Sequence, residues 1–420
     1  MGPMPRVLLV VPTATYRAEA FLDAAARLRV EVTVASERVQ ALADLMGHRF
    51  LEVPLDDPEE AADRIVTLDR RAPLDAVVAV DDQGLLTAAL AAARLGLAHN
   101  PPDAVAATRD KAALRRRLAA AEVPQPAFAA LEGGDDLGEQ AIEAADGIGL
   151  PVVVKPPGLS ASRGVIRADD PAGVRAAARR VLRLLEHLCE PARLVVEAYV
   201  PGDEVALDGL LEDGRLVPLA LFDKPDPLVG PYFEETLYVT PSRHPAVVQA
   251  QVIAVAQRAV TALGLVDGPV HAELRLPATA GGLPAPVVLE VAARTIGGRC
   301  SSALRFAAGA SLEEIVLAHA LRRPLPTIPG DGASGVMMLP IPASGRLVAV
   351  EGRDRAAKVP GITGVEVTVP VGSHLEAFPE GDRYPGFLFA QADTPAEVEA
   401  ALRAAHGELE LRIEPDQVAS

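Results

Sequence analysis

Tryptophan, cysteine and lysine are scarce in this chain of 420 residues, and each scarcity limits the kinds of protein that the chain can be. Tryptophan is absent and aromatic residues make up only 3%, so the cores must consist of Ala, Val and Leu. The two cysteines, Cys189 and Cys300, match neither a disulfide framework nor a metal-binding pattern, which is typical of a reducing cytoplasm. No apolar run approaches the length of a signal-peptide core or a membrane span, so we expect neither and predict a cytoplasmic protein.

The charge balance is strongly acidic. The formal net charge is −17 and the isoelectric point is about 5.0. This balance argues against nucleic acid as a general partner. An anionic ligand would therefore have to be held by a local basic pocket.

Lysine stands at only four positions, whereas arginine supplies the other basic residues. A lysine ammonium is a compact charge on a flexible stem that can reach a single phosphate oxygen. Lys111 opens a helical pattern over residues 108–121, and Lys155 ends an apolar strand over residues 148–155. These two are the first candidates for a phosphate site. Lys224 lies in a segment rich in acidic and aromatic residues, and Lys358 receives no role.

The pattern of the first hundred residues predicts a parallel, doubly wound sheet, because apolar strands alternate with amphipathic helices. No Gly-x-Gly-x-x-Gly turn follows the first strand, so a dinucleotide site of the usual kind is not expected there. Proline-rich stretches at 100–102 and 324–332 indicate domain boundaries.

A loop of small residues follows Lys155. Ser160, Ser162 and Gly164 lie in it, between two predicted strands. Glycine and small hydroxyl residues let backbone N–H groups converge on phosphate oxygens, and a strand pair around such a loop can close as a flap. The loop does not end in Gly-Lys-Ser/Thr, so it is not a P-loop. A plain surface hairpin would show the same pattern, and Lys155 beside it favours the phosphate site.

Two glutamates are predicted to face each other across a hairpin. If the hairpin is symmetric about Gly281 and Gly282, Glu273 pairs with Glu290, with Cβ atoms about 5 Å apart. Opposed carboxylates destabilise a sheet unless a cation lies between them, and Mg²⁺ prefers such oxygen ligands. Two solvated glutamates on an edge hairpin are the alternative.

Two more residues near this pair are candidates for catalysis. Arg294 lies four residues beyond Glu290 and could stabilise a developing negative charge, although a structural ion pair is the alternative. His271 should project to the same strand face as Glu273, where it could contact substrate or accept a proton from an amine. A satisfied core histidine fits the pattern nearly as well.

A strand over residues 194–200 offers contacts for adenosine. Glu197, Ala198 and Val200 lie along this strand edge, and Glu204 follows a turn, where it could accept from ribose hydroxyls. Solvated carboxylates at a turn are the default alternative.

The order of these features resembles the ATP-grasp superfamily. The residues that carry the resemblance are Lys111, Lys155, the loop 158–164, Glu197, Glu204, Glu273, Glu290 and Arg294. The resemblance implies ATP phosphates on the two lysines, adenine near Glu197, ribose on Glu204 and magnesium on the opposed glutamates. It implies an N-terminal doubly wound parallel-sheet α/β domain (1–105), a linker helix and lid (106–200), an antiparallel-sheet metal and substrate subdomain (201–332) and a C-terminal α+β domain (333–420).

The segment 290–298 is most similar to the L-amino-acid ligase branch and related carboxylate–amine ligases. The C-terminal motifs at 360–362 and 386–390 are similar to the extra domain of that branch. The resemblance implies ATP-dependent joining of a carboxylate, an amino acid above all, to an amine through an acyl phosphate. The segment 222–236 is expected to form a loop over the acceptor site, where Lys224 and Glu235 would contact substrate, and a solvated connection is the alternative. Gly298 is also expected to contact substrate. Many relatives carry Asn where this chain has Ala292, which weakens the case for a second firmly held ion.

The expected cofactors are ATP and Mg²⁺, with Mn²⁺ as an alternative ion. The expected partners are a small carboxylate and an amine, with no nucleic acid and no membrane, and a homodimer is left open. Two other functions stay open. One is a bicarbonate-activating carboxylase of the purine-pathway or biotin type, and the other is an ATP-binding regulatory protein without turnover.

Overall fold

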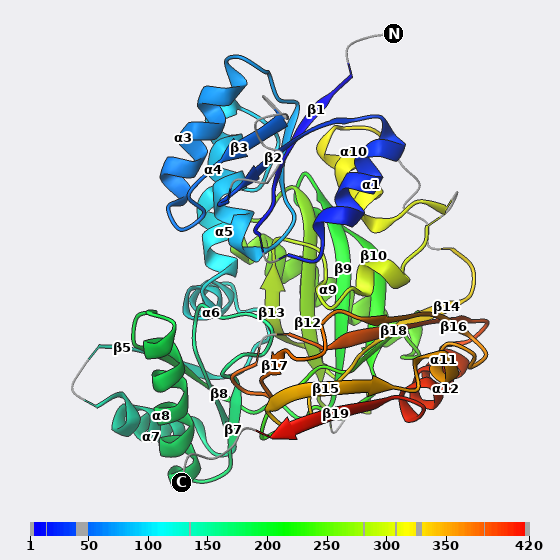
Figure 1. The fold of residues 1–420 in the computed structure, drawn as a ribbon. Coiled ribbons are helices and arrows are strands. Elements are labelled where there is room, and N and C mark those ends of the chain that lie inside the picture. The colour runs from blue at the N-terminus through cyan, green and yellow to red at the C-terminus, as the bar shows by residue number, and fades with distance from the viewer. Residues whose placement is uncertain are drawn as a thin grey trace.

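The computed structural model describes residues 4–13, 15–38, 49–133, 136–279, 282–306, 309–324, 330–381 and 383–415. Figure 1 shows three regions: an N-terminal domain, a lid that stands apart at the lower left, and a large central sheet that continues into the C-terminal strands.

The N-terminal domain is built on a four-stranded sheet in the order β3-β2-β1-β4, and every pairing in it is parallel. Its strands are β1 (Arg6–Val10), β2 (Glu31–Ser36), β3 (Phe50–Glu52) and β4 (Ala76–Ala79), and its helical segments are α1 (Ala18–Leu28), α3 (Pro58–Asp69), η2 (Asp82–Gly84) and α4 (Leu85–Leu95). Successive residues of β1 alternate between two cores: Leu9 packs with α1, and Leu8 packs with α3 and α4. The expected doubly wound arrangement is confirmed.

Helix α10 (Leu312–Ala320) also packs on this sheet, although it lies far away in sequence. Its Val316 and Leu317 join the core formed by α1, β1 and β4. A Ser311 capping box starts the helix. The N-terminal domain is therefore completed by a helix from a distant part of the chain.

The lid is a four-stranded antiparallel sheet in the order β5-β8-β6-β7, covered by two helices. Its elements are β5 (Phe128–Glu132), α7 (Leu137–Ile148), β6 (Val152–Lys155), β7 (Ile166–Ala168), α8 (Pro171–His187) and β8 (Arg193–Ala198). The predicted hairpin around the loop after Lys155 is confirmed, because β6 pairs with β7 in antiparallel register. The sequence analysis did not identify β5 or α7.

The central sheet has eight strands in the order β13-β12-β9-β10-β11-β14-β18-β16. It contains β9 (Asp203–Glu212), β10 (Arg215–Lys224), β11 (Leu237–Thr240), β12 (Gly268–Leu276), β13 (Val287–Ala292), β14 (Ala333–Met338), β16 (Ile362–Val367) and β18 (Gly386–Ala392). A tight turn at Asp213 and Gly214, both with positive φ, joins β9 to β10. Because β11 pairs with β14, the sheet runs through the predicted boundary at residue 332; the domain limits themselves stay predictions.

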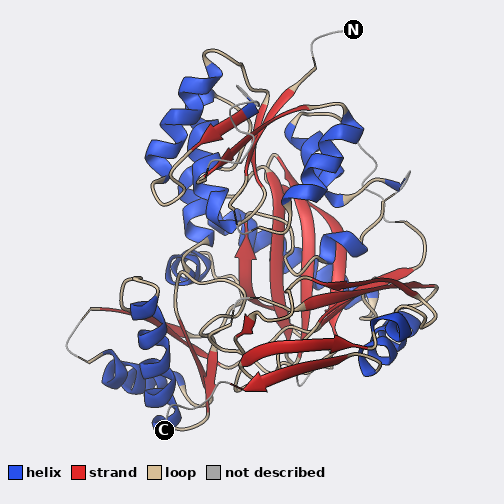
Figure 2. Ribbon diagram, in the orientation of Figure 1, coloured by secondary structure: helices blue, strands red, loops and turns tan. Residues whose placement is uncertain are grey.

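The C-terminal part adds a second, three-stranded sheet in the order β17-β15-β19. Its elements are β15 (Gly345–Glu351), α11 (Arg353–Ala356), β17 (His374–Leu375), α12 (Pro395–Gly407) and β19 (Glu410–Pro415). Figure 2 shows these strands beside the central sheet, with the end of β19 directed toward the lid.

The region between the N-terminal domain and the lid differs from the expected single helix over 108–121. The structure has two helices, α5 (Pro102–Thr108) and α6 (Lys111–Ala120). Helix α5 ends at Thr108 with Arg109 as its C-cap, and Asp110 caps α6, since its side chain accepts from the N–H of Ala113 at 2.9 Å. This break places Lys111 at the first turn of α6.

Helix α9 (Ala246–Leu263) corrects one expectation about length. Among the described helices it is long and apolar enough to cross a membrane by length and composition alone. That test is weak evidence, because Val248, Val252, Ala256 and Leu263 pack in the core beneath the central sheet. We interpret α9 as a core helix.

Arg115 offers a test of how α6 is attached to both sheets. Its guanidinium is fully buried, pairs with Glu197 on β8 at 2.7 Å and donates to the carbonyls of Val288 and Leu289. Arg115→Ala would leave the Glu197 charge without its main partner, so we expect a loss of about 3–5 kcal/mol in the free energy of unfolding. Chemical denaturation measures it. The exposed neighbour is the control: Arg116→Ala should change stability by less than about 0.5 kcal/mol, and equal effects of the two variants would contradict this role of Arg115.

Candidate active site

One pocket lies between the lid and the central sheet, and it brings together most of the residues that the sequence analysis selected. The predicted residues that line it are Lys111, Lys155, Ser162, Glu197, Ala198, Val200, Glu204, Glu235, Glu273 and Glu290. Its other lining residues are Pro126, Val153, Val165, Tyr199, Leu228, Phe233, Arg275 and Leu289. Lys111 and Lys155 therefore face one cavity although 44 positions separate them in the sequence.

The polar wall of the pocket comes from strand alternation. On β12, His271, Glu273 and Arg275 lie on one face, while Ala272 and Leu274 pack in the core on the other. On the neighbouring β9, Asp208 pairs with His271 and Glu204 pairs with Arg275. The period of two thus produces matched opposite charges across adjacent strands.

The predicted pairing of Glu273 with Glu290 is confirmed in the sheet register. The symmetric register holds for Glu273 and toward His271, and it shifts by one residue beyond, where Leu274 pairs with Val288. This irregularity lies at Leu289, which lines the pocket. Of the two hairpin glycines, Gly281 lies outside the described residues.

Lys224 is the buried centre of an acidic cluster. Its ammonium lies 2.6 Å from Glu204, 2.6 Å from Glu235 and 2.8 Å from Glu273. Burial alone would lower the pKa of Lys224, but the three carboxylates outweigh it and hold the pKa well above its usual value. Lys224 is therefore a fixed cation, and the structure shows it bound to protein carboxylates.

The same cluster perturbs its carboxylates in opposite directions. Burial raises the pKa of Glu235 to about 7, despite the opposing charge of Lys224. Burial would also raise the pKa of Glu273, but Lys224 and His271 outweigh it and hold that pKa well below its usual range. Within the described residues, one group of carboxylates is close enough to share a metal ion: Glu204, Glu235 and Glu273. Lys224 contacts all three and already supplies a positive charge there.

Lys155 is held by a second buried network. Its ammonium lies 2.7 Å from Glu197, whose other contacts go to Arg115. Burial lowers the pKa of Lys155 to about 8, against the opposing effect of Glu197. Arg115 and Lys155 outweigh burial for Glu197 and lower its pKa to about 2. The Glu197 carboxylate thus orients Lys155, a role that the sequence analysis did not foresee when it placed Glu197 beside adenine.

Lys111 reaches the far side of the same pocket. Its ammonium donates to the carbonyl of Leu159 at 2.5 Å and lies 3.9 Å from Glu290. Its backbone N–H donates to the carbonyl of Pro157 at 2.9 Å. The first turn of α6 is thereby tied to the loop that follows Lys155.

That loop agrees only in part with the expected phosphate cradle. Ser162 lines the pocket, and Ala161 and Ser162 both have positive φ. Ser160 is exposed and accepts from the N–H of Arg163. The N–H of Gly164 donates to the carbonyl of Pro379 at 2.9 Å, and the expected contact of Gly164 with phosphate stays a prediction. The sequence could not reveal this partner, which comes from the C-terminal part.

Apolar and aromatic side chains form the remaining wall. Tyr199 stacks on Phe233 with ring centroids 6.4 Å apart, and the Arg167 guanidinium lies 4.2 Å from the Tyr199 ring centre. Ala198 and Val200 flank this tyrosine on the strand edge. A flat apolar slot beside a charged wall suits a purine with a phosphate tail.

His271 is buried between Asp208 at 3.0 Å and Glu273 at 3.4 Å. Burial alone would lower the pKa of His271, but hydrogen bonds to both carboxylates outweigh it and raise the pKa to about 9. An imidazole that keeps its proton at neutral pH is a poor proton acceptor. The structure thus favours the alternative of a satisfied buried histidine over a general base.

Arg294 pairs with a residue of the N-terminal domain. Its Nε donates to Asp82 at 2.6 Å, and another of its nitrogens donates to the carbonyl of Thr295. Burial would lower its pKa, but Asp82 and, more weakly, Glu290 hold the pKa above its usual value. The guanidinium is fixed near Glu290 without being among the residues that line the pocket, and its catalytic role stays a prediction.

Gly298 is explained by packing. It has a φ of +58°, and a Cβ at this position would lie 2.5 Å from Sδ of Met338. Gly298 does not line the described pocket, so its expected contact with substrate stays a prediction.

Arg275, Arg115 and Asp82 are site residues that the sequence analysis missed. Arg275 pairs with Glu204 at 2.7 Å. Its position two residues after Glu273 on one strand was a usable signal, as was the position of Arg115 four residues after Lys111 on one helix. Nothing in the sequence pairs Asp82 with Arg294, because they lie 212 positions apart.

Comparison with known families matches three segments of the chain. Residues 22–99 match the ATP-grasp N-terminal domain, residues 148–303 match the ATP-grasp domain, and residues 337–414 match the L-amino acid ligase C-terminal domain 2. The matched segments identify the chain as an ATP-grasp protein, and its C-terminal segment is similar to that of the L-amino acid ligases. The resemblance inferred from the motifs, including that of the C-terminal part, is thereby confirmed.

Individual relatives agree with this placement. The chain is 27% identical over 240 residues to alanine–anticapsin ligase of Bacillus amyloliquefaciens. The matched region covers 53% of this chain and 49% of that protein. This chain thus spans about half the length of that curated relative. An L-amino acid ligase structure from Bacillus licheniformis superposes with a TM-score of 0.77 at 24% identity, covering 98% of this chain and 99% of that one.

A carboxyaminoimidazole ribonucleotide synthase from Aspergillus clavatus, in complex with ATP, superposes with a TM-score of 0.73 at 16% identity. The superposition covers 97% of this chain and 99% of that one. At such identities the two structural likenesses support the ATP-grasp fold alone.

The pKa of Lys155 generates a test of its role. Lys155 is protonated below about pH 8, and a bound polyphosphate favours its charged form. We therefore expect the affinity for ATP to begin falling as the pH rises through about 8, by roughly tenfold in all. Calorimetric ATP titrations from pH 6.5 to 9.5 measure this. Lys155→Met should bind ATP weakly at every pH without this transition, and a similar pH dependence in that variant would assign it to another group.

Proposed function

We propose that this ATP-grasp protein is an ATP-dependent ligase that joins a carboxylate, an amino acid above all, to an amine. The reaction proceeds through an acyl phosphate and releases ADP and phosphate. The observation that carries the proposal is the convergence of Lys111 and Lys155 with the opposed Glu273 and Glu290 in one pocket that also has an apolar slot.

Each set of residues has a task in this reaction. Phosphoryl transfer requires positioning and charge neutralisation more than a covalent catalyst. Lys155, held by Glu197, and Lys111, tied to the loop at Leu159, present two ammonium groups to the phosphates. Tyr199 and Phe233 supply the surface on which adenine stacks. The lid excludes water from the acyl phosphate.

The carboxylates suit a divalent cation. Among the described contacts, Lys224 and His271 both reach Oε1 of Glu273, so Oε2 is the oxygen available to a metal. Glu290 lies opposite, with a partly exposed side chain. Carboxylate oxygens are the ligands that Mg²⁺ prefers, and Mg²⁺ bound there would neutralise charge on the phosphates. The side chain of Ala292 offers no ligand oxygen, so the side-chain ligands of this site are the two glutamates.

The carboxylase alternative draws on the likeness to the Aspergillus clavatus enzyme. The match of residues 337–414 to the L-amino acid ligase C-terminal domain favours the ligase. A regulatory protein without turnover is less favoured, since nucleotide binding alone does not require both lysines and both glutamates. The cytoplasmic location, the homodimer, and the absence of nucleic acid and membrane partners stay predictions.

A substrate panel separates the three functions. We expect phosphate release from ATP to depend on added amino acids, with an amide product detected by mass spectrometry. Release that requires bicarbonate and aminoimidazole ribotide would indicate the carboxylase. A protein that binds ATP yet stays silent with every substrate would indicate the regulatory function.

Replacement of Glu290 tests the metal assignment. Glu290→Ala should lower turnover by at least about a hundredfold, because charge stabilisation by a metal ion contributes several kcal/mol. The melting temperature should change little, since Glu290 is only partly buried. Glu351→Ala, which removes an exposed glutamate of β15, is the control and should keep full turnover. Unchanged ATP consumption in Glu290→Ala would refute the assignment.

A further inference from the structure

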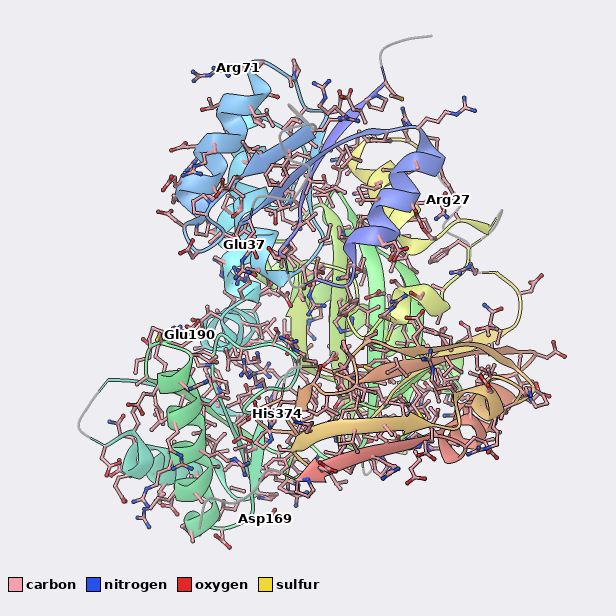
Figure 3. All side chains as sticks on the ribbon, viewed as in Figure 1. Arg27, Glu37, Arg71, Asp169, Glu190 and His374 are labelled. Atoms are coloured by element: carbon pink, nitrogen blue, oxygen red, sulfur yellow. The ribbon has the colours of Figure 1, made fainter. Side chains whose placement is uncertain are left out.

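The C-terminal part of the chain contacts the nucleotide loop of the lid directly. The carbonyl of Pro379 accepts from the N–H of Gly164 at 2.9 Å, and the carbonyl of Glu380 accepts from Nε of Arg163 at 2.7 Å. Both acceptors belong to a turn that follows β17. We call Pro379 and Glu380 the clasp. Figure 3 shows side chains filling the zone between this region, marked by His374, and the lid.

The side chain of Glu380 makes a further contact with the lid. Its two carboxylate oxygens accept from Nε and a terminal nitrogen of Arg180 on α8, at 2.5 and 2.8 Å. Such a two-point pair fixes orientation as well as distance. Glu380 therefore holds the loop through its carbonyl and the lid helix through its carboxylate.

A second segment supports the lid from the same side. Arg180 also donates to the hydroxyl of Tyr232 at 2.5 Å, and Tyr232 forms a β-bridge with Ile166 on β7. The N–H of Arg167 donates to the carbonyl of Pro231 at 2.8 Å. Arg180 thus joins the clasp to the segment that also carries the pocket residues Phe233 and Glu235.

We infer that Glu380 is a positioning residue for nucleotide binding and acyl transfer. Through Arg163 and Arg180, and beside Pro379, which accepts from Gly164, it holds the loop 160–164 over the phosphates, so that the C-terminal part keeps the lid closed while the acyl phosphate exists. This inference rests on the proposed function for its second half, the protection of the acyl phosphate. Its first half, retention of nucleotide, is independent of which substrates react.

The chemical consequence is a change in coupling. When the lid is closed, the amine attacks the acyl carbon and phosphate leaves, so one ATP yields one amide. When the lid opens early, water attacks instead and returns the free carboxylate and phosphate. A loosened clasp should therefore raise the ATP consumed per amide formed.

Glu380→Gln is the test, because it keeps the size and the backbone carbonyl but removes the charge. We expect dissociation of a fluorescent ADP analogue to quicken roughly threefold, the scale of a partly exposed ion pair. The Gly164 amide should exchange its hydrogen faster, and the ATP consumed per amide should rise by a similar factor. The melting temperature should stay close to that of the parent.

Two further variants sharpen the test. Glu408→Gln removes one partner of the Arg355–Glu408 ion pair, in which Nε of Arg355 lies 2.8 Å from a carboxylate oxygen of Glu408. This pair belongs to the same C-terminal part but is not one of the lid contacts described above. It should leave all three readouts unchanged. The exchanged pair Arg180→Glu with Glu380→Arg restores opposite charges and should recover part of the loss seen in either single variant.

The readouts keep this inference separate from the proposed function. Unchanged analogue dissociation and unchanged Gly164 exchange in Glu380→Gln would overturn the positioning role. Faster dissociation in a protein that forms no amide with any amino acid would support the clasp as a nucleotide-retaining contact and would refute the ligase proposal alone. A coupling ratio that stays at the parent value, despite faster dissociation, would overturn the protection of the acyl phosphate.

Discussion

The pocket depends on cations that are buried among carboxylates. Taking an ammonium or guanidinium group out of water is costly unless opposite charges and hydrogen bonds replace the solvent. Lys224 meets this condition with three carboxylates, and Arg115 and Lys155 share Glu197. Each network draws its members from several elements, so the strands and the helix α6 must be in place together. Arg115 joins the lid to the central sheet, because it pairs with Glu197 on β8 and donates to two carbonyls of β13.

This arrangement assigns different tasks to residues of one type. Lys155 carries a pKa lowered to about 8 by burial, while that of Lys224 is raised by its acidic neighbours. Lys155 has one carboxylate partner, Glu197, whereas Lys224 has three. The carboxylates divide in the same way, since Glu235 has a raised pKa and Glu273 a lowered one. Position among neighbours decides the chemistry of each group.

The site is assembled from parts that are distant in sequence. The N-terminal domain supplies Asp82 to Arg294, and the C-terminal part supplies Pro379 and Glu380 to the lid loop. Helix α10, which follows the active-site strands, completes the core of the N-terminal domain. The central sheet thus holds three regions in a fixed relation, and the pocket lies where the lid meets it.

The sequence by itself determined the local features of this protein. The alternation of β12 and the glycines after it were enough to predict that Glu273 faces Glu290, because a hairpin is a short-range structure with a period of two. The rarity of lysine was enough to select Lys111, Lys155 and Lys224, all of which lie at the pocket or in its acidic cluster. Motif order was enough to identify the ATP-grasp family.

Only the tertiary structure decided which side chains already have partners. The N–H of Gly164 donates to Pro379, Glu197 orients Lys155, and His271 lies between Asp208 and Glu273. Each of these assignments depends on contacts between residues that are far apart along the chain. Such contacts follow from the packing of whole sheets and helices, which no local pattern encodes. A residue type states what a group can do, and its folded surroundings determine which charge and which partner it has.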